Sequence, residues 1–360
     1  MKTFQLTDRD RILYIRLSAI GDVVNAIPGL VALRESFPNN FIAWCVGETP
    51  AAILRGHPMI DELLIVKDKW RQNPLAPENR REIGALFRRM RELNFTVAID
   101  AHCLLKSALV ARFSGAPLRV AGNFARNYEG YKYWMNALTE FDNTIKGPAA
   151  AYRGSCLRGI GVDTSRLHYV LPPLAQEVET VKALLLAEGI PTDGRRVVIL
   201  NPRASRRTKE WPGEYFVELG RKLAAHDRVQ LLWTGSPAER ESIAALASQI
   251  RETRSVNLAG RLNLRELAAL YSINKLLVTG DTGPMHIGAA AGIFVVALMG
   301  SMDPAEHGPF TDRRLILTAG LPCQYCSSRA CEHVRCLTEL RPERVYQSVK
   351  GLIDSGLLEN

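Results

Sequence analysis

In the first half of the chain, short apolar runs alternate with segments in which apolar residues recur at helical spacing. Residues 11–17 form the first such run, and Val23, Ile27 and Leu30 then recur every three or four residues. Continuous apolar runs of this length are typical of buried strands, and the wider spacing is typical of helices. The same alternation predicts strands at 41–46, 62–66 and 96–99, with helices near residue 51 and from about residue 80. This order predicts a mostly parallel sheet with helices on both faces.

The pattern weakens between residues 122 and 174 and ends at Pro172-Pro173, which we interpret as the link between two domains. The alternation then restarts, with strands predicted at 196–200, 229–234, 256–258, 276–279 and 294–299, and helices at 213–225, 237–250 and 264–271. A chain of 360 residues is also longer than a single hydrophobic core usually serves. We therefore predict an α/β protein with two doubly wound domains, residues 1–173 and 174–360, facing each other across a cleft.

A tight loop, Ser18-Ala19-Ile20-Gly21-Asp22, joins the first predicted strand to the helix that follows it. Asp22 therefore lies where the carboxyl end of a strand meets the amino end of a helix. In open α/β sheets this is where ligands bind. The alternative is that Asp22 only caps the helix, which is a common reason for an aspartate at this place. The loop by itself is compatible with both interpretations.

A second loop with similar chemistry covers residues 279–286 (Thr-Gly-Asp-Thr-Gly-Pro-Met-His), between a strand-like run and a helix of small residues. Such a turn presents several free backbone N–H groups at the positive end of the helix dipole, which suits a phosphate or pyrophosphate. The alternative is that Asp281 or Thr282 caps the helix and Gly283 eases the turn. The occurrence of two such loops in one chain favours the ligand-binding interpretation.

Two more polar loops follow predicted strands. The loop after strand 196–200 carries four cations, Arg203, Arg206, Arg207 and Lys209. Ammonium and guanidinium groups neutralise a leaving phosphate, so this loop is a candidate polyphosphate site, with a solvated basic loop as the alternative. The loop after strand 96–99 begins at Asp100 and carries Lys106 and Ser107, which suit an anionic ligand. Its alternative is a helix cap beside a surface lysine. Four polar loops at strand ends favour one common cleft.

The composition is ordinary for a globular protein, with 47% hydrophobic and 23% charged residues. A net charge of +9 and a pI near 9.3 favour anionic partners, such as a phosphorylated ligand, nucleic acid or an acidic membrane surface. No apolar run reaches the ~20 residues that a membrane span needs. The polar residues 1–10 contain no signal-peptide core. We therefore expect a cytoplasmic protein.

Four of the seven cysteines lie in one short segment near the carboxyl terminus: Cys323, Cys326, Cys331 and Cys336. In a reducing compartment such a cluster is more often a metal site than a pair of disulfides, and thiolates suit tetrahedral zinc. His333 is a further candidate ligand. The alternative, which we weigh equally, is a loop whose cysteines pack or stay free. The remaining cysteines are interpreted as small apolar residues.

Several motifs of common enzyme classes are absent from the sequence. It contains no Gly-x4-Gly-Lys-Ser/Thr segment, and no Gly-x-Gly-x-x-Gly follows the first predicted strand. A P-loop NTPase and a dinucleotide oxidoreductase are therefore disfavoured. No Gly-x-Ser-x-Gly segment is present either, which counts against an α/β-hydrolase.

Taken together, the four loops resemble glycosyltransferase family 9, the ADP-heptose:lipopolysaccharide heptosyltransferases. The resembling segments are 17–23, 100–107, 208–212 and 280–286, in the expected order over most of the chain. The resemblance implies the GT-B fold, with two Rossmann-like domains: an acceptor-binding domain first and a nucleotide-sugar-binding domain second. It also implies transfer of a heptose, with inversion, from a nucleotide-diphosphate sugar to the inner core of lipopolysaccharide.

By this resemblance Asp22 is the general base that deprotonates the acceptor hydroxyl, and Lys209 stabilises the leaving diphosphate. Donor-binding roles fall to residues of three loops: Ser18, Gly21, Thr208, Asp281, Thr282, Gly283 and His286. Lys106 and Ser107 are expected to contact an anionic sugar of the acceptor. Because a helix dipole and a lysine usually replace a divalent metal in GT-B enzymes, no metal is expected to be required for catalysis.

The resemblance leaves the acceptor open between Kdo and a first heptose. The 100–107 loop is closer to the first heptosyltransferases, and the cysteine segment is closer to the second. ADP-heptose is the expected donor, and an anionic glycolipid at the cytoplasmic face of the inner membrane is the expected acceptor. The alternatives are a nucleotide-sugar epimerase on the same scaffold and a basic nucleic-acid-binding protein with a zinc knuckle.

Overall fold

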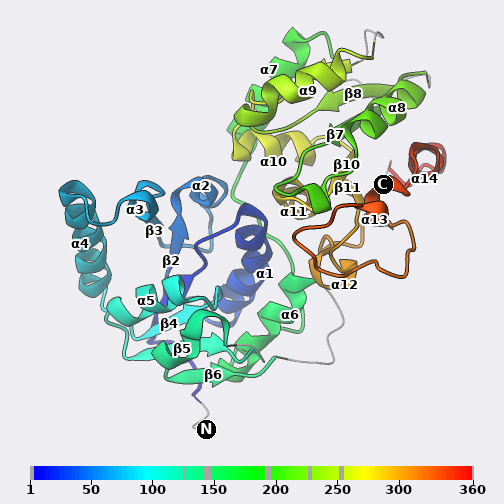
Figure 1. Ribbon diagram of the computed structural model, residues 1–360. Coiled ribbons are helices and arrows are strands. Elements are labelled where there is room, and N and C mark those ends of the chain that lie inside the picture. The colour runs from blue at the N-terminus through cyan, green and yellow to red at the C-terminus, as the bar shows by residue number, and fades with distance from the viewer. Residues whose placement is uncertain are drawn as a thin grey trace. The chain divides into compact units, whose positions relative to one another are not determined.

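The computed structural model describes residues 4–124, 127–141, 148–190, 196–225, 229–250 and 255–358. The chain divides into two compact units, Met1–Pro173 and Leu174–Asn360. Each unit is built on its own six-stranded sheet with helices on both faces (Figure 1). In both sheets every pair of neighbouring strands is parallel.

The sheet of the first unit has the strand order β3-β2-β1-β4-β5-β6. Its strands are β1 (Arg11–Ile15), β2 (Phe41–Gly47), β3 (Glu62–Val66), β4 (Val97–Asp100), β5 (Leu118–Gly122) and β6 (Ala137–Thr139). The connecting helices are α1 (Ile20–Ser36), α2 (Glu48–Ala51), α3 (Lys69–Gln72), α4 (Pro77–Glu92), α5 (Leu105–Phe113) and α6 (Ala149–Ser155). The described residues of this unit also form three short 3₁₀ helices: η1 (Ala52–Leu54), η2 (Tyr128–Trp134) and η3 (Cys156–Ile160).

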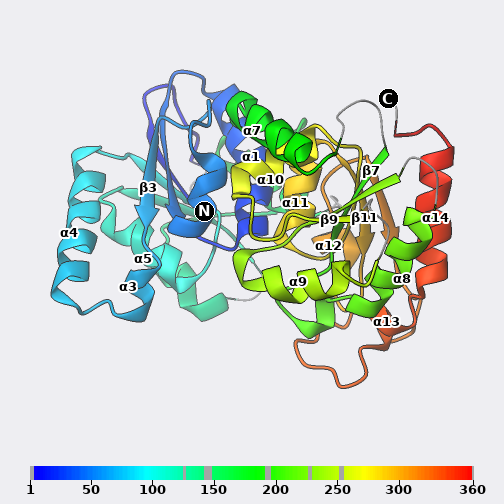
Figure 2. The ribbon, with the colours of Figure 1, turned by 90° about the horizontal axis from the view of Figure 1, so that it is seen from above.

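The apolar strand β1 lies in the middle of this sheet because both of its faces are covered. Ile12, Leu13 and Ile15 are completely buried, as expected for a strand of a parallel sheet between two helical layers. On one face α1 approaches β1 closely at Gly29, where a Cβ atom would lie 2.9 Å from the Tyr14 hydroxyl oxygen. The helix α4 lies at the outer edge of the unit (Figure 2). Met90 of this helix is buried, whereas its arginines are exposed.

The second unit has the strand order β12-β11-β10-β7-β8-β9. Its strands are β7 (Arg196–Asn201), β8 (Val229–Trp233), β9 (Ser255–Asn257), β10 (Leu276–Gly280), β11 (Phe294–Leu298) and β12 (Arg314–Leu317). The longer helices are α7 (Ala175–Ala187), α8 (Gly213–Ala224), α9 (Arg240–Ala247), α10 (Leu264–Ser272), α11 (Gly283–Ala291) and α14 (Pro342–Asp354). The short ones are η4 (Arg207–Lys209), η5 (Pro237–Glu239), α12 (Pro304–His307) and α13 (Arg335–Thr338).

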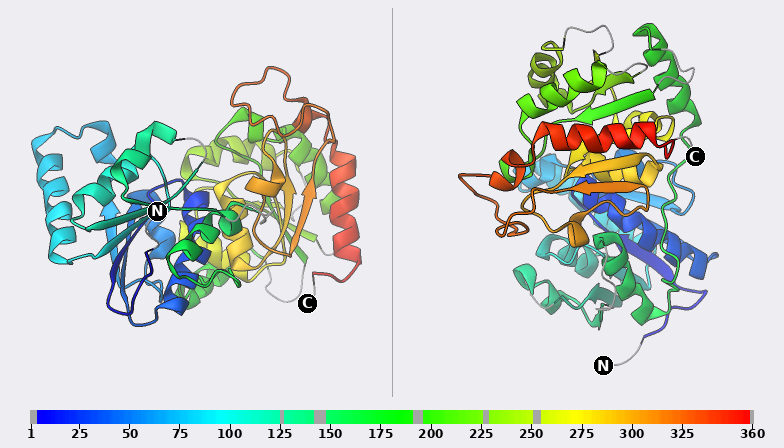
Figure 3. Two further views of the ribbon diagram at one scale, coloured as in Figure 1. Left: turned by 90° about the horizontal axis from the view of Figure 1, so that it is seen from below. Right: turned by 90° about the vertical axis from the view of Figure 1, so that its right-hand side faces the viewer.

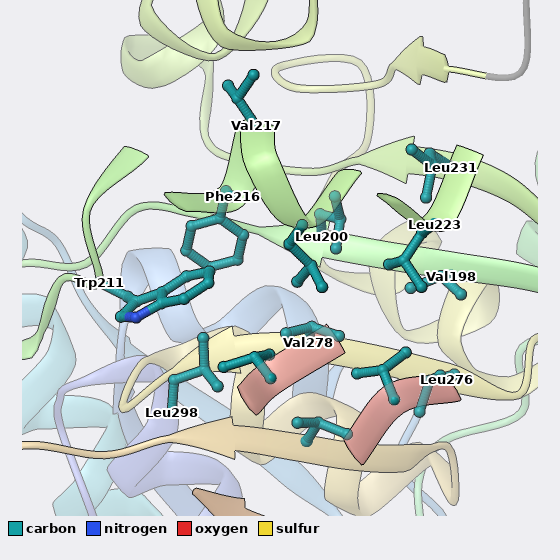
Figure 4. Close-up of a cluster of buried hydrophobic side chains, with 14 of the residues drawn as sticks. Val198, Leu200, Trp211, Phe216, Val217, Leu223, Leu231, Leu276, Val278 and Leu298 are labelled. Atoms are coloured by element: carbon teal, nitrogen blue, oxygen red, sulfur yellow. The ribbon is translucent and has the colours of Figure 1, made fainter. Parts of the chain in front are cut away.

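The core of the second unit is centred on Trp211, which is completely buried just before α8. Its ring packs edge-on against Phe216 with ring centroids 4.9 Å apart, above Leu298 of β11 (Figure 4). The indole N–H donates a 2.7 Å hydrogen bond to the Leu340 carbonyl oxygen, just before α14. The apolar face of α14 joins the same core, so the carboxyl-terminal helix covers the sheet beside α8 (Figure 3).

Numbered within its own unit, each sheet has the order 3-2-1-4-5-6. This is the doubly wound Rossmann order, in which the direction of winding reverses between the first and fourth strands. The reversal lies between β1 and β4 in the first unit and between β7 and β10 in the second. A crevice forms at the carboxyl ends of such a strand pair, and ligands bind there. The predicted α/β class with two Rossmann-like sheets is confirmed.

Most predicted elements occur within a few residues of their expected positions, and the differences lie where apolar patterning is weak. The predicted helix from residue 80 begins at Pro77, and the predicted helix 237–250 divides into η5 and α9. Three strands were not predicted: β5, β6 and β12. Of these, β6 lies in the weakly patterned stretch after residue 122. Within the described part of the chain, no helix is both long and apolar enough to cross a membrane.

Candidate functional site

Asp22 lies at the switch point of the first unit, in the first turn of α1. It is the third residue of the helix, so it does not occupy the capping position itself. One carboxylate oxygen pairs with the Arg16 guanidinium at 2.8 Å, and the other accepts a 3.4 Å hydrogen bond from the Ala19 N–H. The Asp22 side chain is 41% exposed, whereas that of Arg16 is only 5% exposed. The ion pair therefore holds an accessible carboxylate over a buried cation.

Arg16 was not among the residues singled out by the sequence patterns. It follows β1 at the end of an apolar run, and its guanidinium also donates a 2.7 Å hydrogen bond to the Ala101 carbonyl oxygen. Arg16 thereby joins the loop after β1 to the loop after β4. A charged residue within an otherwise apolar strand was the available signal, because such a residue is seldom buried without a partner.

Asp100, the last residue of β4, is completely buried and organises the loop that follows. Its Oδ1 accepts hydrogen bonds from the N–H groups of His102 (2.9 Å) and Cys103 (3.0 Å). Burial raises the pKa of this carboxyl to about 6, although these hydrogen bonds and Arg16 act in the opposite direction. The His102 ring in turn accepts a 3.2 Å hydrogen bond from the Leu17 N–H at its Nδ1. This second link between the two loops was also missed by the sequence patterns.

The two residues expected to contact the acceptor have different surroundings. Lys106 is exposed, and its ammonium group donates a 2.8 Å hydrogen bond to the Ser18 hydroxyl. Ser107 is completely buried, and its hydroxyl contacts the Asp100 Oδ2 at 3.0 Å and the Leu104 carbonyl oxygen at 2.8 Å. Ser107 therefore fixes the loop in this structure, because a buried hydroxyl with these partners is not presented to a ligand. Gly21 is buried in the first turn of α1.

At the switch point of the second unit, Lys209 and Asp281 form an ion pair with 2.6 Å between Nζ and Oδ2. Lys209 ends η4, in the loop after β7, and Asp281 directly follows β10. Their side chains are only 16% and 8% exposed. Gly280 permits this arrangement, since a Cβ atom there would lie 2.7 Å from the Lys209 carbonyl oxygen.

The amino end of α11 lies beside this pair. Thr282 precedes the helix with an extended backbone, but its side chain makes no capping hydrogen bond. Its hydroxyl instead lies 3.2 Å from the Thr279 hydroxyl. Gly283 is the first helical residue, and His286 is buried in the first turn. Thr282 thus occupies the capping position of α11 without a capping side-chain hydrogen bond among the described residues, which favours the anion-binding interpretation of this helix end.

Thr208 is buried next to Lys209, and its hydroxyl has no hydrogen-bond partner among the described residues. The loop is held by its backbone, because the Ser301 hydroxyl donates a 2.9 Å hydrogen bond to the Thr208 carbonyl oxygen. Arg203 of the same basic loop is paired with Glu210 at 2.8 Å. Of the four predicted phosphate-binding cations, Lys209 is thus the one placed at the α11 terminus, while Arg206 and Arg207 are exposed.

The four clustered cysteines do not share one environment. Cys323, Cys326 and Cys331 are exposed and Cys336 is buried, and all four are free thiols. Burial raises the pKa of the Cys336 thiol, which opposes the thiolate form that binds metals. Among the residues described here, no group of three or more His, Cys, Asp or Glu side chains is arranged to hold a metal ion. A zinc site at these cysteines therefore remains a prediction from their spacing.

Comparison with known proteins identifies the family. Residues 83–336 match the profile of glycosyltransferase family 9 (heptosyltransferase). Lipopolysaccharide heptosyltransferase 1 of Pseudomonas aeruginosa is 26% identical over 364 residues, covering 95% of this chain and 98% of that protein.

Two solved structures share the fold. A family 9 glycosyltransferase of Veillonella parvula has a TM-score of 0.83 at 24% identity, covering 98% of this chain and all of that one. The E. coli heptosyltransferase WaaC with ADP has a TM-score of 0.74 at 21% identity, covering 94% and 99%. These likenesses confirm the GT-B fold. Because the family profile extends over well more than half of the sequence, the chain belongs to glycosyltransferase family 9, the heptosyltransferase family.

Proposed function

We propose that the protein transfers a heptose from ADP-heptose, with inversion, to a Kdo or heptose of the lipopolysaccharide inner core. The observation that carries this proposal is the pair of switch-point sites with opposite charge. The first unit presents the accessible Asp22 carboxylate, and the second presents Lys209 at a helix amino end. Glycosyl transfer to a hydroxyl needs both chemistries, because a proton leaves the acceptor and negative charge develops on the diphosphate.

In the acceptor-binding first unit, Asp22 is the general base. An inverting transfer needs a carboxylate that accepts the proton of the attacking hydroxyl as the new glycosidic bond forms. Arg16 supports this role in two ways. Its ion pair holds the Asp22 carboxylate in place, and its hydrogen bond to Ala101 fixes the guanidinium against the second loop. The exposed side of Asp22 is then the side from which the acceptor hydroxyl approaches.

In the nucleotide-sugar-binding second unit, Lys209 and the amino end of α11 bind the diphosphate. Asp281 positions the Lys209 ammonium group beside the N–H groups that follow Thr282. The cation and the helix dipole together neutralise the charge that develops as the bond between the sugar and the diphosphate breaks. We infer that this arrangement supplies the charge for which other glycosyltransferases use a divalent metal, so that added metal is not required.

The acceptor is an anionic glycolipid, and we propose that the protein meets it at the cytoplasmic face of the inner membrane. The net charge of +9 supports attraction to such a surface. Exposed arginines on α4 contribute to this charge, among them Arg80, Arg81, Arg88 and Arg91. Lys106, beside Ser18, is placed to meet an acidic group of the acceptor sugar.

The test is transfer from ADP-heptose to heptose-deficient Kdo-lipid A, and to the same lipid carrying one heptose. Wild-type protein is compared with Asp22→Asn and with Asp8→Asn, an exposed aspartate before β1 at the opposite end of the strands. Asp22→Asn should retain the donor affinity measured by calorimetry and lose roughly 10²- to 10⁴-fold in transfer rate. Asp8→Asn should behave as wild type in both measurements.

Three outcomes would contradict the proposal in different ways. Absence of ADP-heptose binding would exclude the donor. Conversion of the donor without any acceptor would favour an epimerase. An Asp22→Asn variant that transfers at the wild-type rate would leave heptosyl transfer intact and remove Asp22 from its role as the base.

A further inference from the structure

A groove of about 540 Å³ lies in the first unit at the carboxyl ends of β1, β2 and β3. One wall is the loop that contains Ser18 and Ile20, which ends at Asp22. Ala19 also lines the groove, and its backbone N–H donates a hydrogen bond to the Asp22 carboxylate. The groove therefore begins beside the proposed base and extends away from it, toward α3.

The opposite wall carries a fixed carboxylate. Asp68 is exposed to the groove region, and its Oδ2 accepts a 2.7 Å hydrogen bond from the Thr49 hydroxyl. The backbone N–H of Asp68 donates to the Glu48 carboxylate at 3.2 Å, which fixes the turn on which it lies. Gln72 adds an amide to the same wall, and the remaining lining is largely apolar: Leu17, Ile20 and Pro50. An apolar lining with a few placed polar groups is typical of small-molecule binding sites.

The cations nearest to this wall in the sequence are engaged elsewhere. Lys67 and Lys69 flank Asp68, and both pair with Glu82 of α4, at 3.2 and 2.9 Å. Glu82 also accepts a 2.9 Å hydrogen bond from the Trp70 indole N–H. The hydrogen bond from Lys69, followed by that from Trp70, lowers the pKa of Glu82 to about 2, so this residue stays ionised at neutral pH. Among the residues that line the groove, Asp68 is the one that carries a charge.

The two ends of the groove thus differ in charge. At the Ser18 end, the Lys106 ammonium group lies 2.8 Å from the Ser18 hydroxyl. At the α3 end lies the Asp68 carboxylate. A carboxylate accepts hydrogen bonds from sugar hydroxyls and repels a phosphate, because like charges at contact distance disfavour binding.

We propose that this groove holds the hydroxyl-rich terminal ring of the acceptor, and that Asp68 is a specificity residue which selects against a phosphate on that ring. The inference rests on the proposed function for the identity of the acceptor. Lys106 takes the acidic group of the acceptor near Asp22, and Asp68 takes hydroxyl groups further along the groove. The proposal adds a stated chemical preference to the acceptor: an inner core that has not been phosphorylated on the ring in the groove.

The first measurement is direct binding by calorimetry to the full-length protein. The probes are two deacylated inner-core oligosaccharides, ending in Kdo or in a first heptose, each with and without one phosphate on the terminal sugar. For at least one oligosaccharide, the wild type should bind the unphosphorylated form ~10-fold or more tightly than the phosphorylated form. Asp68→Asn should weaken binding of the unphosphorylated form about 10-fold and bring the two forms to within about 3-fold. Asp8→Asn is the matched control and should retain the wild-type preference.

A second variant tests the charge argument without touching the groove carboxylate. Glu82→Gln releases Lys67 and Lys69, so binding of the phosphorylated form should strengthen while binding of the unphosphorylated form stays unchanged. Circular dichroism and the thermal midpoint of each variant show whether it is folded. The proposal is overturned if the wild type binds neither oligosaccharide, if it prefers the phosphorylated form, or if Asp68→Asn and Asp8→Asn behave alike.

Transfer from ADP-heptose to the same acceptors separates this inference from the proposed function. A binding preference that depends on Asp68, without any transfer, would support the groove assignment and refute heptosyl transfer. Transfer at a rate that depends neither on the phosphate nor on Asp68 would support heptosyl transfer and refute the groove assignment.

Discussion

Replacing Asp100 with asparagine should raise the free energy of unfolding relative to the wild type, and the gain should be larger at neutral pH than at acidic pH. The Asp100 carboxyl is completely buried, and its two oxygens accept hydrogen bonds from the His102 N–H, the Cys103 N–H and the Ser107 hydroxyl. An asparagine has the same shape, and its oxygen can still accept from the two backbone N–H groups. The substitution therefore removes the titration of this site and keeps most of its geometry.

The expected size follows from the pKa. Burial raises the pKa of Asp100 from its ordinary value of 3.8 to about 6. A difference of about two pKa units corresponds to roughly 3 kcal/mol, as an order of magnitude. Because the folded protein holds this proton more tightly than the unfolded chain, the stabilisation is present below about pH 4 and is lost as the pH rises through about 6. Asp100→Asn has no such loss, so its advantage over the wild type should grow by roughly 3 kcal/mol over this range.

The assay is urea unfolding of the full-length wild type and of Asp100→Asn at several pH values between about 4 and 7. Other groups titrate equally in both proteins, so the difference between their free energies of unfolding isolates Asp100. Asp8→Asn provides the control, because it removes an exposed carboxyl that lies outside the hydrogen bonds of Asp100. A difference that is flat, or that grows toward low pH, would refute the reasoning. It would mean that Arg16 and the three hydrogen bonds outweigh burial.

Three further predictions concern the two switch-point sites and the second core. Lys209→Met should lower the free energy of unfolding in urea by roughly 3–5 kcal/mol, because it leaves the Asp281 carboxylate buried without its cation. The double variant that also carries Asp281→Asn should recover this stability but not the donor affinity measured by calorimetry. Arg16→Met should lower the transfer rate constant about 10-fold or more while the donor dissociation constant stays unchanged, since Arg16 orients Asp22; an unchanged rate would argue against that role. Trp211→Phe should lower the free energy of unfolding by about 1–3 kcal/mol, because the Leu340 carbonyl loses its donor, and a stability equal to wild type would contradict this.

The sequence was sufficient for the fold class because most of its strands are continuous apolar runs. Strands of a parallel sheet are buried on both faces, so β1, β2, β10 and β11 are recognisable without any partner information. The strand β6 has only three residues, and half-buried positions dominate β12, so neither leaves a comparable signal. Sequence alone also does not report strand order, and the order decides which loops share a switch point.

The positions of the candidate site residues in the fold were predictable to the level of the loop and less so to the level of the side chain. Asp22, Lys209 and Asp281 follow strands and lie at the predicted places. Ser107 has a hydroxyl of the kind that contacts ligands, yet this hydroxyl is buried and donates a hydrogen bond to Asp100. Such a difference depends on which way a short loop turns, and a single sequence carries little information on that. Arg16 was overlooked for the opposite reason, because it lies within an apolar run.

The strand order gives the two sites a relation that individual motifs do not reveal. In each unit, a loop after the first strand of the sheet and a loop after the fourth strand contribute to one crevice. In each crevice an acid and a base form an ion pair, at 2.8 Å for Arg16 and Asp22 and at 2.6 Å for Lys209 and Asp281. The charge that is more exposed is the carboxylate in the first unit and the ammonium group in the second. The two units therefore present opposite charges on the same scaffold. The less exposed member of the ion pair is the cation in the first unit and the anion in the second. A transfer reaction between a hydroxyl and a sugar diphosphate uses both, and this is the physical reason why we propose that the acceptor binds to the first unit and the donor to the second.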